Sequence, residues 1–159
     1  MKKLGLLFAM LCVCAATVFA QEGFRIVTNH PDFKIKVVRC EVSGKTCVID
    51  LILENASSRD VRLNMSGNYY KVVSVAYDDE ANEYVNFRVG IGSSGLDDAG
   101  VNTTLLSEVP VKARIQIEGV VPSATMFRRM DVTFYCEEWG LNENKKVKFY
   151  NLPITHDGD

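Results

Sequence analysis

The sequence predicts an all-β protein folded as a two-layer antiparallel β-sandwich of about seven to nine strands. Apolar and polar residues alternate along most of the chain, which is the pattern of half-buried strands. Turn-forming residues separate these segments at intervals typical of sandwiches. No segment places apolar residues at helical spacing over the ~11 residues that a stable helix needs, so the strands are expected to pack on one another.

The expected strands cover residues 33–37, 47–53, 61–65, 69–77, 84–91, 111–117, 132–136 and 147–149. Between Val37 and Val38 the apolar row moves from odd to even positions, which predicts a β-bulge or a strand that changes sheets. One or two helical turns are expected over residues 122–130. The sandwich therefore spans residues 33–154, after an extended leader at 21–32 and before a flexible tail at 155–159.

The N-terminus has the three parts of an export signal. Lysines at positions 2 and 3 precede an apolar run, residues 4–16, that is too short to span a membrane. Small residues at Val18 and Ala20 then predict cleavage after residue 20. We interpret residues 1–20 as a signal peptide and expect a periplasmic or secreted protein that keeps no membrane span.

Charge and composition exclude several function classes. The chain has 18 basic and 20 acidic residues, and loss of residues 1–20 would change the net charge from −2 to −4 by removing two lysines. Nucleic-acid binders carry a concentrated basic face, so nucleic acid is not an expected partner. The glycine-rich residues 90–95 spell G-x-G-x-x-G, but no amphipathic helix follows them, which favours a loop between strands over a dinucleotide site. No cofactor is expected.

Three cysteines follow the signal peptide. A two-residue hairpin loop at Ser43 and Gly44 would place Cys40 opposite Cys47, and this arrangement predicts a disulfide between them. A three-residue loop would shift the register and spoil the alignment. Cys136 alternates with apolar residues and is expected to be a buried thiol.

The acidic segment at residues 78–83 offers oxygen ligands. Asp78, Asp79 and Glu80 could belong to a calcium loop, but the segment lacks the spacing and the glycine of an EF-hand. The sequence therefore favours a solvated hairpin loop and keeps calcium as the alternative.

Aromatic residues are the remaining candidates for contact with a ligand or partner. Tyrosine and tryptophan on a sheet face can stack on sugars or anchor a protein. Partial core positions are the competing explanation. The candidates are Trp139, which has polar neighbours, and Tyr69, Tyr70 and Tyr84.

Four segments carry a resemblance to a family: IDLILEN (49–55), DVRL (60–63), VPVKARIQIEGV (109–120) and VKFYNLPI (147–154). They resemble the small secreted immunoglobulin-like domains of Bacteroidales-type bacteria. The resemblance implies an immunoglobulin-like β-sandwich and no functional residue. The antibody-type order of cysteine, tryptophan and cysteine is not matched, because Trp139 follows the last cysteine.

Together these observations predict a non-enzymatic binding or interaction module of the bacterial cell envelope. The partner is expected to be an envelope protein. The alternative is a carbohydrate or another small ligand that binds exposed aromatic residues. A hydrolase is the third hypothesis, and it would need a cleft with two close carboxylates.

Overall fold

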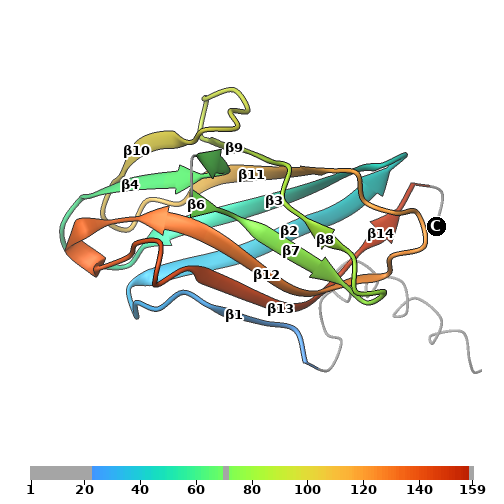
Figure 1. Ribbon diagram of the computed structural model, residues 1–159. Coiled ribbons are helices and arrows are strands. Elements are labelled where there is room, and N and C mark those ends of the chain that lie inside the picture. Colours follow the sequence, from blue (N-terminus) through green and yellow to red (C-terminus); the bar gives the residue numbers. More distant parts are fainter. Residues whose placement is uncertain (1–22, 70–71, 158–159) are drawn as a thin grey trace, which may run out of the picture.

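The computed structural model describes residues 23–69 and 72–157 and shows a two-layer β-sandwich (Figure 1). A seven-stranded sheet and a five-stranded sheet face each other, and a separate two-stranded hairpin joins β5 (Asn68–Tyr69) to β6 (Val72–Val73). The described residues hold more strands than expected, because several pairings extend over only two residues. The predicted signal peptide, residues 1–20, lies outside the described residues.

The seven-stranded sheet has the order β1-β13-β12-β4-β10, and β7 and β8 extend it beside β12. All of its pairings are antiparallel. One edge of β12 pairs with β7 in its first half and with β4 in its last three residues. The strands are β1 (Arg25–Val27), β4 (Val61–Ser66), β7 (Val75–Asp78), β8 (Glu83–Tyr84), β10 (Val101–Leu105), β12 (Met126–Tyr135) and β13 (Val147–Pro153).

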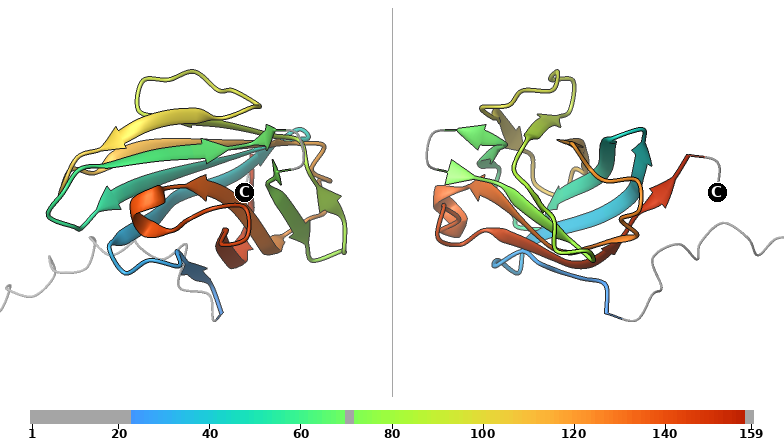
Figure 2. Two further views of the ribbon diagram at one scale, coloured as in Figure 1. Left: turned by 60° about the vertical axis from the view of Figure 1, so that its left-hand side comes forward. Right: turned by 45° about the vertical axis from the view of Figure 1, so that its right-hand side comes forward.

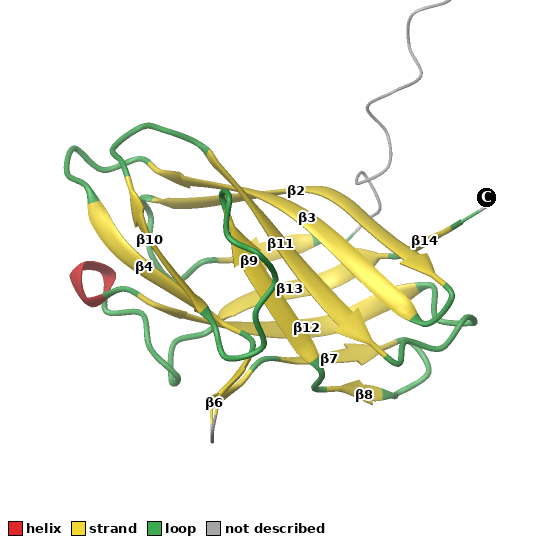
Figure 3. Cartoon of the chain, turned by 90° about the horizontal axis from the view of Figure 1, so that it is seen from above, coloured by secondary structure: helices red, strands yellow, loops and turns green. Residues whose placement is uncertain are grey.

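The five-stranded sheet has the order β14-β2-β3-β11-β9, and it lies over β12 and β13 in Figure 3. Antiparallel pairing joins β2, β3, β11 and β9, whereas β14 runs parallel to β2. The strands are β2 (Phe33–Ser43), β3 (Thr46–Asn55), β9 (Phe87–Ile91), β11 (Val111–Glu118) and β14 (Thr155–His156).

The core lies between the two sheets. Along β3 every second residue is buried, as the alternation in the sequence predicts. Five phenylalanines from both sheets are almost fully buried in this core: Phe33, Phe87, Phe127, Phe134 and Phe149. The predicted bulge in β2 is confirmed, because the register with β3 shifts between Val37 and Arg39. The bulge leaves Val38 51% exposed on the outer face.

Both ends of the described chain join the sandwich. Part of the expected leader forms β1, which pairs with β13. Residues 155 and 156, which the sequence places in a flexible tail, pair instead with β2. The Thr155 hydroxyl donates a hydrogen bond to the carbonyl of Cys40 (3.0 Å), and His156 Nε2 lies 2.8 Å from the carbonyl of Ala124. These long-range partners explain the order, and the sequence gives no sign of them.

The expected helical turns at residues 122–130 are wrong. Residues from Met126 onward form β12, because their backbone groups pair with β13 and β7. Within the described part of the chain the helical structure is one 3₁₀ turn, η1 (Glu137–Trp139). No helix in these residues has the length and apolar character needed to cross a membrane.

Candidate functional site

Trp139 is not an exposed contact residue. Its side chain is 7% exposed and stacks against two rings from the chain before β3. The centroid of His30 is 5.2 Å away with an interplanar angle of 18°, and that of Phe33 is 5.0 Å away at 30°. The sequence shows only the polar neighbours of Trp139, whereas the turn of η1 directs the indole inward.

Tyr84 is also buried, with 6% of its surface exposed. Its hydroxyl donates a 2.6 Å hydrogen bond to Asp78 Oδ2, and its ring packs edge-on against Phe127. Burial and the neighbouring Asp78 carboxylate raise the pKa of Tyr84 to about 12. Tyr70 and the side chain of Tyr69 lie outside the described residues.

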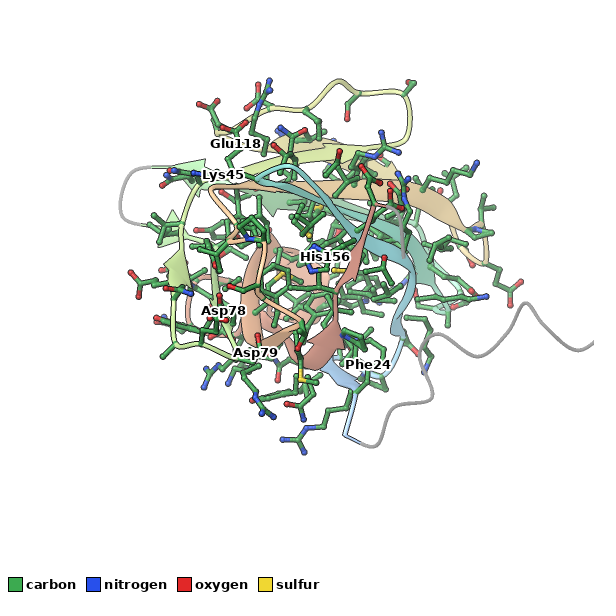
Figure 4. The ribbon with its side chains drawn as sticks, turned by 90° about the vertical axis from the view of Figure 1, so that its right-hand side faces the viewer. Phe24, Lys45, Asp78, Asp79, Glu118 and His156 are labelled. Carbon is green, nitrogen blue, oxygen red and sulfur yellow. The ribbon has the colours of Figure 1, made fainter. Side chains whose placement is uncertain are left out.

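The acidic segment, in which Figure 4 labels Asp78 and Asp79, forms a turn held by hydrogen bonds. Asp78 accepts hydrogen bonds from the backbone N–H groups of Glu80 and Asn82, and from the side chains of Asn82 and Tyr84. Burial opposes ionisation of Asp78, but these hydrogen bonds outweigh it and lower its pKa.

The other two carboxylates of this segment are also engaged. Asp79 accepts bonds from the backbone and hydroxyl of Thr125, and Glu80 accepts one from Ser123. The described residues contain no group of three or more His, Cys, Asp or Glu side chains suited to a metal ion. The geometry around Asp78, Asp79 and Glu80 therefore gives the calcium alternative no support.

The predicted disulfide between Cys40 and Cys47 is not present. The hairpin loop is at Gly44 and Lys45, so Cys47 pairs with Val42 and Cys40 pairs with Ile49. The two cysteines are therefore diagonal neighbours, and their sulfur atoms are 3.7 Å apart. A disulfide needs about 2.05 Å. Their mutual hydrogen bond and burial raise the pKa of Cys40 well above its usual value.

The described tyrosines that reach solvent lie elsewhere. Tyr77 is 38% exposed on the outer face of the seven-stranded sheet. Strand pairing places it in one row with Arg129, Tyr150 and Arg25. The guanidinium carbon of Arg25 lies 4.3 Å from the ring centroid of Tyr150, and that of Arg129 lies 5.9 Å from it. We call these four residues the Arg–Tyr row.

A groove of about 550 Å³ crosses the outer face of the five-stranded sheet. It is formed by strands β2, β3 and β11 and by the glycine-rich loop that follows β9, which rises above this sheet in Figure 2. The loop folds back because residue 97 pairs with Val89. We call it the glycine-loop groove, and its side-chain lining comprises Val38, Asp50, Ile52, Ser94, Leu96, Lys112 and Arg114.

Strand register brings opposite charges together along the groove. Arg114 on β11 pairs with Asp50 on β3, which pairs with Arg39 on β2. Asp50 Oδ1 accepts a 2.7 Å bond from Arg114 Nε, and Oδ2 lies 2.9 Å from Arg39 Nη2. Partial burial opposes ionisation of Asp50, but the two arginines outweigh it and lower its pKa. The same contact raises the pKa of Arg114.

A second hollow, of about 540 Å³, lies on the outer face of β10, β4 and β12. It is polar, with Tyr135, Glu137 and Glu138 at one end. Backbone hydrogen bonding at Glu138, including its own N–H, lowers the pKa of this carboxyl. The Tyr135 hydroxyl has its pKa raised by partial burial and by Glu143.

The residues of the glycine-loop groove were not identified from the sequence. Its polar lining residues on β3 and β11 occupy the outward positions of the predicted strands at 47–53 and 111–117, so the sequence predicts that they are exposed. Their convergence depends on register and on the fold of the loop after β9, and neither has a local signal. The sequence identifies the glycine-rich residues 90–95 only as a loop between strands.

No protein-family model and no curated protein matches this chain. Among solved structures, it is similar to a family 123 glycoside hydrolase from Clostridium perfringens, with a TM-score of 0.38 and 13% sequence identity. The match covers 72% of this chain and 21% of the enzyme, so the chain spans about a fifth of that protein's length. A likeness at this level assigns no function.

Proposed function

We propose that this protein is an exported, non-enzymatic binding module of the bacterial cell envelope, and that it holds a small ligand in the glycine-loop groove. The observation that carries this proposal is the concave site of about 550 Å³ built over the Arg39–Asp50–Arg114 contacts. Sites for small molecules are typically hollows of ~300–1,000 Å³ in which a few polar groups converge. Altered pKa values at Asp50 and Arg114 are also typical of functional sites.

Two reactive groups lack the pKa shift that two particular catalytic roles require. A general acid needs a raised pKa, whereas the pKa of Glu138 in the second hollow is lowered. A cysteine nucleophile needs an accessible thiolate. Burial raises the pKa of Cys136 to about 11 instead.

A second candidate function is docking of an envelope protein on the seven-stranded sheet. The Arg–Tyr row favours it, because tyrosine and arginine dominate the binding energy of many protein interfaces. The same row disfavours sugar stacking on Tyr150, since guanidinium groups approach that ring from both neighbouring strands.

The first proposal can be tested by filling the groove. Gly95 lines it, and an added Cβ would meet no atom within 4 Å, so Gly95→Trp is expected to block the groove without disturbing the fold. Ser93→Trp, on the same exposed loop but outside the lining, is the matched control. Both variants and the wild type would be applied to a glycan and metabolite array.

A ligand that binds the wild type and Ser93→Trp, but binds Gly95→Trp at least tenfold more weakly, supports the groove. A ligand that binds all three proteins equally would overturn this assignment. If Arg129→Ala abolishes capture of a defined envelope protein while Gly95→Trp does not, the docking function is favoured.

A further inference from the structure

Arg114 carries hydrogen-bond donors that no described residue uses. Its Nε donates to Asp50, and its side chain is 50% exposed. No described residue accepts a hydrogen bond from its two terminal amino groups. Guanidinium presents its N–H groups in a planar fork that matches the two oxygens of a carboxylate. Arg114 therefore has one edge of this fork available to a ligand in the groove.

Lys112 is a second available cation. It lies two residues before Arg114 on the same face of β11, a separation of about 7 Å along a strand. Both residues line the groove, and Lys112 makes no hydrogen bond or ion pair with any described side chain. Asp50 is the acidic residue among the lining, so it balances only one of the two charges.

The neighbouring arginine does not alter this balance. Arg39 lies beside Asp50 but outside the lining, where its Nη1 is 3.5 Å from Glu41 Oε2 and the Asp157 carboxylate also interacts with it. The groove is left with one net positive charge, shared by Lys112 and Arg114. This charge attracts an anion, and the free edge of the Arg114 fork matches the two oxygens of a carboxylate.

Apolar surface adjoins the two cations. Ile52 pairs with Lys112 in the register of β3 and β11 and is half-buried on the floor of the groove. Val38 and Leu96 also belong to the lining, on β2 and on the loop after β9. A ligand held by its acid group would therefore place its carbon skeleton over Ile52.

We propose that the glycine-loop groove binds small ligands through a single carboxylate, which Arg114 and Lys112 hold while Ile52 contacts the ligand body. This inference rests on the proposed function, because it assumes that the groove is the binding site. An acidic sugar and the C-terminal end of a peptide both supply this chemistry. Recognition by the acid group, not by stacking on an aromatic ring, is what distinguishes this site.

The test measures binding of four probes to the full protein by titration with NMR detection at millimolar concentration. D-glucuronate and D-glucose differ only in the acid group at C6. N-acetyl-alanine represents a peptide end, and inorganic phosphate represents a different anion. The variants are Arg114→Lys, Arg114→Gln and Lys112→Gln, with Lys148→Gln on the opposite sheet as a control.

We expect a carboxylate probe to bind and glucose to bind at least tenfold more weakly. Loss of charge-assisted hydrogen bonds in Arg114→Gln should weaken binding about tenfold to hundredfold. Arg114→Lys should lose most of the same affinity because lysine lacks the fork, and Lys148→Gln should bind normally. Preference between glucuronate and N-acetyl-alanine identifies the source of the carboxylate.

Three outcomes would overturn the inference: equal binding of glucose and glucuronate, tighter binding of phosphate, or no binding of either carboxylate probe. The proposed function fails separately, if array ligands bind Gly95→Trp as well as they bind the wild type. If the groove bound neutral ligands, the proposed function would therefore stand, and the proposed recognition of a carboxylate would be refuted.

Discussion

The buried carboxylate of Asp78 should make a large, pH-dependent contribution to stability. Asp78→Asn removes the charge and replaces one of two accepting oxygens with an amide that donates. Each carboxylate oxygen accepts two hydrogen bonds, so the variant loses two whichever oxygen is replaced. At Oδ2, for example, these are the bonds from Tyr84 (2.6 Å) and the Asn82 side chain (2.8 Å). Hydrogen bonds to charged groups contribute ~1.5–3 kcal/mol each, so we expect a loss of about 3 kcal/mol in the free energy of unfolding at pH 7.

The effect should depend on pH in one direction. The folded-state pKa of Asp78 is below its unfolded value, which is about 3.9. The stabilisation from its charge is therefore complete above the unfolded pKa and is lost as the pH falls through the folded pKa. The difference between wild type and Asp78→Asn should accordingly shrink as the pH falls below about 4.

Urea unfolding followed by the fluorescence of Trp139 measures this difference at each pH. Asp79→Asn is the matched control, since Asp79 is exposed and its bonds go to Thr125 at the surface. Asp79→Asn should lower the free energy of unfolding much less than Asp78→Asn does. Equal midpoints for wild type and Asp78→Asn at pH 7, or a difference that grows in acid, would refute the reasoning.

Other consequences of the structure can be tested in the same way. Trp139→Ala should lower the free energy of unfolding by about 3–5 kcal/mol, measured by circular dichroism in urea, because it empties the space beside Phe33. The thiol of Cys136 should react with a disulfide reagent at pH 8 only after urea is added, since burial raises its pKa to about 11; rapid reaction of the folded protein would contradict this. Gly67→Ala should destabilise the protein by about 1–3 kcal/mol, because the new Cβ would lie 2.6 Å and 2.7 Å from two backbone oxygens, whereas Gly95→Ala should have little effect. Similar melting temperatures for the two glycine variants would argue against the packing around Gly67.

The sequence predicts the positions of the strands better than it predicts which strands pair. The alternation in β3 and β11 predicts which side chains are buried, because successive side chains of a strand point to opposite faces. The change of phase at Val38 likewise predicts the bulge in β2. By contrast, β10 was missed, since its outward side chains Asn102 and Thr104 give only a short and weak pattern.

The predicted disulfide failed because of strand register. Cys40 and Cys47 miss their predicted alignment because the loop lies at Gly44 and Lys45, one position later than expected. When a hairpin loop moves by one residue along the chain, the partner of each residue on the opposite strand changes by two positions. Nothing local in the sequence distinguishes the two loops.

By itself, the sequence determined the all-β class, the two-layer architecture and the inward face of the main strands. These properties follow from local periodicity, which the burial of one strand face imposes on the chain. Only the tertiary structure decided that Trp139 and Tyr84 are buried and that Arg39, Asp50 and Arg114 meet beside the glycine-rich loop. The contact between Asp50 and Arg114 joins residues 64 positions apart, and it depends on strand register, which the whole fold determines.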